Sequence, residues 1–129
     1  MGSSIFKVLF VFSFLISSFC YSGQAVTYTI GTIYKVTPDE YKCGQGMPCR
    51  LHFKLNNGGS LELNYIISAP SDIFSLGCTD SNQIYKGLMV SKRKSEFGKI
   101  QVPSTCDTFI LDVYFDVSED THMFFGRDF

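Results

Sequence analysis

The sequence contains no tryptophan, only two histidines and no Asn-X-Ser/Thr sequon. The lack of tryptophan disfavours an antibody-type immunoglobulin domain, and no tyrosine lies two residues before Cys78 or Cys106. After residue 25, no stretch keeps a helical period of apolar residues over about 11 positions. The chain is therefore not expected to build its core from helices or to carry N-linked glycans.

Sequence motifs typical of catalytic or metal-binding sites are also missing. There is no C-x-x-C redox pair, no G-x-S-x-G elbow and no EF-hand loop. Cys43, Cys49 and His52 have the spacing C-x5-C-x2-H, whereas structural zinc sites place two to four residues between cysteines. We therefore predict no catalytic residue, no metal site and no cofactor. His52 is expected to face solvent from a strand, and His122 to be an ordinary residue near the C-terminus.

The acidic residues near the C-terminus could be read as a calcium site, because carboxylates are the oxygen ligands that Ca²⁺ prefers. Asp112 and Asp116 lie four residues apart, and Glu119 and Asp120 follow closely. The simpler interpretation, which we adopt, is a solvated strand face.

Residues 1–25 have the composition of a secretory signal peptide. Lys7 supplies a positive start, the apolar run 8–19 follows, and small residues Gly23 and Ala25 stand at the positions before a cleavage site. The apolar run is shorter than the roughly 20 residues that a membrane-spanning helix needs. We predict a signal peptide over residues 1–25 and one secreted β domain over residues 26–129, with no transmembrane segment in the mature chain.

Four cysteines remain after residue 25: Cys43, Cys49, Cys78 and Cys106. An even number in a secreted chain indicates two disulfides. The preferred pairing is Cys43 with Cys49 and Cys78 with Cys106, because glycines between the first two would let a short ring close. The two crossed pairings stay open. The predicted compartment is extracellular, or periplasmic if the source is bacterial.

Apolar residues alternate with polar ones along most of the chain, which is typical of half-buried antiparallel strands. The pattern is clearest over residues 26–36, 49–55, 60–68 and 107–117. Weaker strand candidates cover residues 73–77, 84–91, 99–102 and 122–125. The chain is rich in rings, with 13 Phe and 7 Tyr. Phe109, Phe115, Phe124 and Phe125 are expected in the core, and an alternative has Phe124, Phe125 and Phe129 meeting a partner or a lipid.

Two local motifs give detailed expectations. Asn57-Gly58 indicates a tight hairpin turn, but the apolar pattern demands a three-residue loop that pairs Phe53 with Leu61, or a five-residue loop. Thr37, Pro38 and Glu40 have the spacing of a capping box, which predicts one helical turn, with a plain turn as the alternative.

These features together predict an all-β domain. The expected fold is a small antiparallel β-sandwich of about seven or eight strands, immunoglobulin-like or jelly-roll-like, stabilised by disulfides. A small barrel is the architectural alternative.

The net charge of the mature chain argues against one class of function. Only Lys7 among the basic residues lies in the first 25, so residues 26–129 hold 10 basic and 12 acidic residues, a net charge of −2. That balance argues against nucleic-acid binding. Lys92, Arg93 and Lys94 form the one basic cluster, which could meet an acidic partner but is also typical of a soluble hairpin tip.

We therefore expect a secreted, non-enzymatic module that binds a protein partner, as an inhibitor, effector or ligand. Strand faces, an open sheet edge or the loops at 39–48 and 92–98 would supply the contact. An extracellular carrier of lipid or another small ligand is the alternative, and a small secreted hydrolase is the third candidate.

Overall fold

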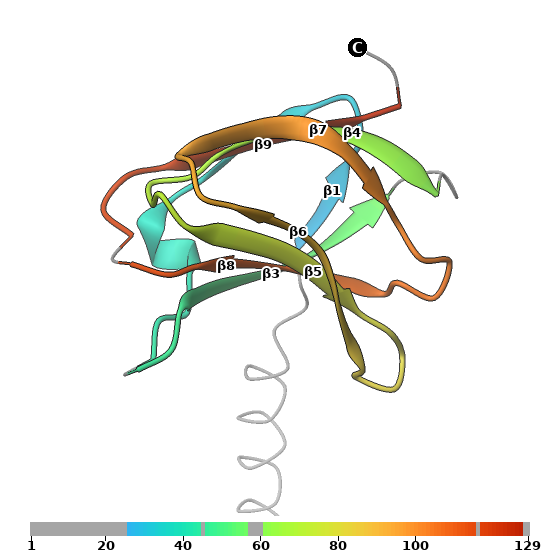
Figure 1. Cartoon of the computed structure of the whole chain (residues 1–129), viewed down its shortest axis with the longest axis horizontal. Coiled ribbons are helices and arrows are strands. Elements are labelled where there is room, and N and C mark those ends of the chain that lie inside the picture. Colours follow the sequence, from blue (N-terminus) through green and yellow to red (C-terminus); the bar gives the residue numbers. More distant parts are fainter. Residues whose placement is uncertain (1–25, 45, 57–60, 116, 128–129) are drawn as a thin grey trace, which may run out of the picture.

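The computed structural model describes residues 26–44, 46–56, 61–115 and 117–127, and it shows two β-sheets stacked face to face (Figure 1). The fold prediction of a disulfide-stabilised, all-β sandwich is confirmed. The predicted signal peptide lies outside the described residues and stays a prediction.

Nine strands and one 3₁₀ turn make up the described chain. Their bounds are β1 (Val26–Thr29), β2 (Ile33–Val36), η1 (Pro38–Glu40), β3 (Cys49–Asn56), β4 (Glu62–Ser68), β5 (Phe74–Thr79), β6 (Tyr85–Ser91), β7 (Ser95–Gln101), β8 (Thr108–Val113) and β9 (Thr121–Gly126). One sheet has five strands in the order β1-β3-β8-β5-β6, and the other has four in the order β2-β9-β4-β7. The described part of the chain contains no helical segment that could span a bilayer.

The continuous alternation over residues 26–36 does not form one strand. The chain turns at Gly31, whose φ of 87° is a left-handed conformation that glycine adopts without steric cost. The Gly31 N–H donates to the Phe125 carbonyl over 2.6 Å. As a result β1 joins the five-stranded sheet and β2 the four-stranded sheet, and β1 runs parallel to β3 rather than antiparallel.

The predicted hairpin between β3 and β4 is wrong. Phe53 does not pair with Leu61; it pairs with Phe109 on β8 and with Val26 on β1. β4 belongs to the other sheet, between β9 and β7. The alternating pattern is satisfied equally by a hairpin and by an arch that carries the chain across the core, because both bury the same face. The turn at residues 57–60 lies outside the described residues.

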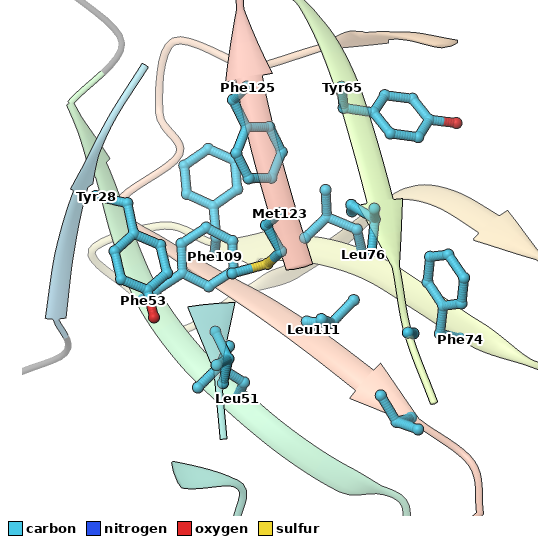
Figure 2. Close-up of a cluster of buried hydrophobic side chains, with 14 of the residues drawn as sticks. Tyr28, Leu51, Phe53, Tyr65, Phe74, Leu76, Phe109, Leu111, Met123 and Phe125 are labelled. Atoms are coloured by element: carbon cyan, nitrogen blue, oxygen red, sulfur yellow. The ribbon is translucent and has the colours of Figure 1, made fainter. Parts of the chain in front are cut away.

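Aromatic rings fill the centre of the sandwich. Phe53 is completely buried, and its ring centroid lies 5.3 Å from that of Tyr28, 5.5 Å from that of Phe109 and 5.9 Å from that of Phe125. Figure 2 shows Tyr28, Phe53 and Phe109 gathered in one cluster with Phe125 of the opposite sheet. Tyr28 also stacks on Tyr34 with centroids 4.2 Å apart. This stack joins the two sheets at the side where β1 continues into β2.

Two of the four phenylalanines assigned to the core do not point into it. Phe109 and Phe125 are buried, as expected. Phe115 is exposed because β8 ends at Val113, two residues before it. Phe124 lies on the outward side of β9, between the buried Met123 and Phe125. Phe129 falls outside the described residues.

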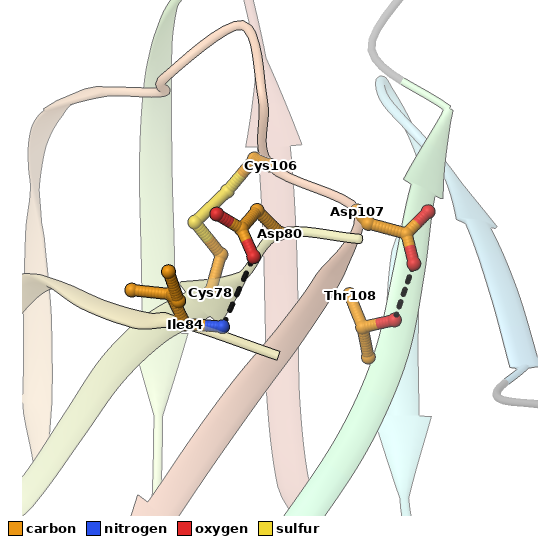
Figure 3. The surroundings of a disulfide bond; sticks show 6 residues. All are labelled: Cys78, Asp80, Ile84, Cys106, Asp107 and Thr108. Atoms are coloured by element: carbon orange, nitrogen blue, oxygen red, sulfur yellow. Dashed lines mark hydrogen bonds between the residues drawn. A yellow bond between two sulfur atoms is a disulfide. The ribbon is translucent and has the colours of Figure 1, made fainter. Parts of the chain in front are cut away.

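Both disulfides have the preferred pairing, Cys43–Cys49 and Cys78–Cys106. Figure 3 shows the second bridge tying the end of β5 to the segment that leads into β8. Next to it, the Asp80 carboxylate accepts hydrogen bonds from the backbone N–H groups of Asn82 and Ile84, at 2.8 and 3.0 Å. The bridge therefore fixes a segment whose turn is already ordered by a local side chain.

The helical turn predicted at Thr37 is present. Pro38–Glu40 form η1, and the Glu40 carboxylate accepts a hydrogen bond of 2.7 Å from the backbone N–H of Thr37. Tyr41 follows, and its hydroxyl donates to Thr121 over 2.6 Å in the interior. Burial, partly offset by that hydrogen bond, raises the pKa of Tyr41 to about 12. The turn thus anchors the start of the disulfide loop to β9.

Candidate functional site

The outer face of the four-stranded sheet carries a row of apolar side chains, one from each strand. Ile33 of β2 stands opposite Phe124 of β9, Phe124 opposite Ile66 of β4, and Ile66 opposite Phe97 of β7. We call these four residues the apolar row. Directly opposite residues in antiparallel strands hold their side chains about 5 Å apart. The register therefore makes one continuous stripe from four separate positions in the sequence.

The apolar row is open to solvent. Phe97 is 77% exposed, Ile33 70% and Ile66 46%. An open hollow of about 430 Å³ lies on the same face, lined by Ile33, Ile66, Phe124 and their neighbours Ser68, His122 and Met123. Single exposed apolar residues are ordinary on protein surfaces, but a contiguous stripe rimmed by polar groups is typical of an interaction surface.

A polar row borders this stripe on one side. Lys35, His122, Ser68 and Ser95 face one another across the same four strands. The Ser95 hydroxyl donates to Ser68 over 3.2 Å, and Lys35 forms an ion pair of 3.3 Å with Asp120. The rim thus has its charge neutralised locally, which leaves the apolar row as the dominant feature of the face.

The outer face of the five-stranded sheet is different, because its centre is polar and internally bonded. The guanidinium of Arg50 donates twice to Asp112, from Nε to Oδ1 at 2.7 Å and from Nη2 to Oδ2 at 3.0 Å. Asp112 is only 5% exposed, so the expectation that it lies on a solvated face is wrong. The paired Asp116 lies outside the described residues, and no group of three metal-binding side chains occurs among the rest.

Tyr85 lies across this polar centre. A Cβ built on Gly77 would overlap the Tyr85 ring, so the ring rests directly on the glycine backbone. Burial, and to a lesser degree the nearby Asp112 carboxylate, raises the pKa of Tyr85. Ser75 lies 3.4 Å from the Tyr114 hydroxyl on the same face. Both tyrosines thus lie near the Arg50–Asp112 pair, although the Arg50 side chain is still 37% exposed.

The contact at Gly77 yields a testable expectation. Gly77→Ala should lower the free energy of unfolding by about 1–3 kcal/mol, because the added methyl must displace the Tyr85 ring. Combining it with Tyr85→Ala should remove most of that extra loss, so the two changes will be strongly non-additive. Urea unfolding of the two single variants and the double variant measures the coupling. Additive losses would contradict the contact.

Neither histidine sits in a catalytic arrangement within the described residues. His52 faces outward on β3 opposite Ile110, and partial burial, then Arg50 and Lys42, lower its pKa. His122 lies in the polar row of the other sheet. Among the described residues, no hydrogen bond connects either ring to a Ser, Cys or carboxylate. The two rings lie on the outer faces of different sheets and cannot act together.

Lys92, Arg93 and Lys94 form the exposed turn between β6 and β7. The loop expected at 92–98 is shorter than predicted, because β7 already begins at Ser95. The Ser91 hydroxyl orders this turn by accepting from the Arg93 N–H at 3.1 Å. The turn lies next to Ser95, where β7 begins, so the basic cluster adjoins the strand that carries Phe97 of the apolar row. β6 and β7 belong to different sheets, so the expected hairpin tip is instead a turn that connects the two sheets.

Sequence reasoning raised Phe124 as an alternative partner contact but missed the apolar row as a whole. The outward positions of β4 are Glu62, Asn64, Ile66 and Ser68, and only Ile66 breaks the polar pattern. Phe97, alone among charged and small residues, gives a similar weak signal. The missing information was the register between strands that are distant in sequence. Comparisons of the chain with known protein families and with curated proteins found no match.

Proposed function

We propose that this protein is a secreted, non-enzymatic module that binds a protein partner through the apolar row on its four-stranded sheet. The observation that carries the proposal is the alignment of Ile33, Phe124, Ile66 and Phe97 on one outward face. Aromatic side chains are enriched at the centres of protein interfaces, where they supply large contact area. Secretion is part of the proposal, and it is supported by the two disulfides.

The packing of the interior favours protein binding over the carriage of a lipid. A ligand held between the sheets would need the space that the rings of Tyr28, Phe53, Phe109 and Phe125 occupy. Phe53, Phe74 and Phe125 are among the largest completely buried side chains. Displacing such rings would cost several kcal/mol each. The apolar row already lies on the surface, so a protein partner could cover it without displacing any core side chain.

A photo-crosslinking experiment tests the proposal. Phe97 is replaced with the photoreactive amino acid benzoyl-phenylalanine, which keeps an aromatic ring at the centre of the β7 contribution to the row. The protein, recovered from the medium of a secreting host, is then irradiated in the extracellular fluid of its source. We expect a discrete covalent adduct with another extracellular protein, because the row would be covered in the complex.

The matched control carries the same photoreactive residue in place of Val90, which is also highly exposed but lies on the five-stranded sheet. The control should give little of that adduct. Equal adduct formation at positions 97 and 90 would contradict the proposal. An adduct made only with a second copy of the chain would also contradict it, because the row would then be a self-association surface.

A further inference from the structure

The two sheets separate at the side of the sandwich where β6 continues into β7. β6 is the last strand of the five-stranded sheet, and β7 is the last strand of the four-stranded sheet. Figure 1 shows the chain leaving β6 in one layer and entering β7 in the other. Each strand pairs with one neighbour, so alternate backbone N–H and C=O groups of both strands point away from their sheets.

A groove of about 530 Å³ lies between these two edges. Leu61, which is 53% exposed, and the partly buried Leu88 of β6 supply apolar surface, and Lys86 and Lys99 stand along its sides. Ile100 and Val102 also line the groove but are themselves buried in the core. The pairing of β6 with β5 shifts register between Leu76 and Gly77 of β5, as at a β-bulge. Leu88 falls within the irregularity, between Met89 and Gly87, and packs partly against the core. Such irregularities bend an edge strand and re-aim its side chains.

The walls of the groove are positively charged within an acidic protein. Residues 85–101 contain five Lys or Arg and one acidic residue, Glu96, whereas the whole chain has a net charge of −1. Glu96 accepts a hydrogen bond of 3.1 Å from the Ser91 hydroxyl. Among the described side chains, Lys86 forms no ion pair, and Lys99 has only the exposed Glu62 at 3.8 Å. The basic residues at the turn 92–94 extend the same positive field.

We propose that the groove between β6 and β7 binds an extended acidic peptide segment, which adds a strand to one of the two sheet edges. Strand addition uses backbone hydrogen bonds for affinity and pockets for alternate side chains for selectivity. Leu61 and Leu88 would receive the apolar side chains of such a segment. Lys86 and Lys99 would face the acidic ones.

A sulfated glycan and an anionic membrane share only the charge with this ligand. Neither offers a row of backbone donors and acceptors to an open strand edge, and neither uses an apolar floor at the spacing of alternate residues. The two edge strands each contain seven residues, which matches a peptide of similar length. Lys99 lies two residues from Phe97 on the same outward side of β7, so the groove borders the apolar row. Its test uses a synthetic peptide and therefore does not depend on the proposed function.

The probe is an acetylated and amidated octapeptide of alternating Glu and Val, added to the ¹⁵N-labelled, oxidised protein at low salt. We expect saturable binding, with amide exchange slowed along β6 or β7. The double variant Lys86→Glu/Lys99→Glu should weaken binding at least about 10-fold, because two attractive charges become repulsive. The matched control Lys42→Glu/Lys54→Glu makes the same change in net charge on the side of β3 and should bind like the wild type.

Three comparisons decide the outcome. An octapeptide of alternating Lys and Val has the same strand preference and should not bind. Binding without slowed exchange at β6 or β7, or equal loss in both double variants, would overturn the proposal. A heparin octasaccharide, or vesicles of phosphatidylserine and phosphatidylcholine, that bind more tightly than the acidic peptide and depend equally on Lys86 and Lys99 would overturn it too.

Discussion

Phe53→Ala is expected to lower the free energy of unfolding by about 3–5 kcal/mol. The side chain is completely buried and contacts rings from β1, β8 and β9, so its removal leaves a cavity where the two sheets meet. Stability of a domain of this size is on the order of 5–15 kcal/mol, so the loss is a large share of the total. Guanidinium unfolding followed by circular dichroism measures the difference.

Two variants keep this expectation falsifiable. Phe53→Leu should be destabilised by less, roughly 1–2 kcal/mol, and remains measurable where the alanine variant does not fold. Phe97→Ala removes the same number of atoms from an exposed position and should change stability by about 0.5 kcal/mol or less. Similar losses at positions 53 and 97 would contradict the assignment of Phe53 to the core and of Phe97 to the surface.

Removing the Cys78–Cys106 bridge by a double change to alanine is expected to reduce stability by roughly 3–4 kcal/mol. The bridge closes a loop with a sequence separation of 28, and a longer loop restricts the unfolded chain more. It also holds β5 and the entry to β8, which are neighbours in the centre of the five-stranded sheet. Thermal and guanidinium unfolding of the oxidised variant measure the loss.

The second bridge provides the comparison. Cys43–Cys49 has a sequence separation of only 6, so the same chain-entropy argument gives roughly 2 kcal/mol for its removal. The order of the two losses is the informative result. A larger loss from removing Cys43 and Cys49 would show that native contacts around the short ring, rather than the restriction of the unfolded chain, dominate its stabilisation.

The local elements of this fold were accessible from the sequence. Alternation along residues 49–55 places Leu51 and Phe53 inward and His52 outward, and the structure agrees. The Cys43–Cys49 pairing and the capping box at Thr37 were also confirmed, because both depend on residues close together in the chain. Cys78–Cys106 was confirmed as the pair that remains. Contacts between residues that are close in the chain depend on their spacing, and this spacing can be read directly from the sequence.

The assignment of strands to sheets was not accessible in the same way. β3 and β4, which were expected to pair as a hairpin, lie in different sheets, and the segment 26–36 forms two strands. In a sandwich, both sheets bury one face against the same core. Alternation therefore reports which side chains point inward, and it does not report which neighbour supplies the backbone hydrogen bonds.

The candidate surfaces also differ in whether they are formed by residues adjacent in the sequence or by residues that strand pairing brings together. Lys92, Arg93 and Lys94 were identified because they are adjacent in the sequence. The apolar row was missed because Ile33, Ile66, Phe97 and Phe124 come from four strands and meet only through register. Asp112 was misjudged for a related reason, since its partner Arg50 lies 62 positions away.

The measurement that tests the central claim most directly is the affinity of the partner identified by crosslinking for two single variants. Phe97→Ser removes the most exposed ring of the apolar row, and Val90→Ser removes a similarly exposed apolar side chain from the other sheet. We predict that Phe97→Ser weakens binding by about 10-fold or more, as truncating an aromatic anchor usually does, and that Val90→Ser leaves it unchanged. Unchanged affinity in Phe97→Ser, or an equal loss in both variants, would contradict recognition through the apolar row.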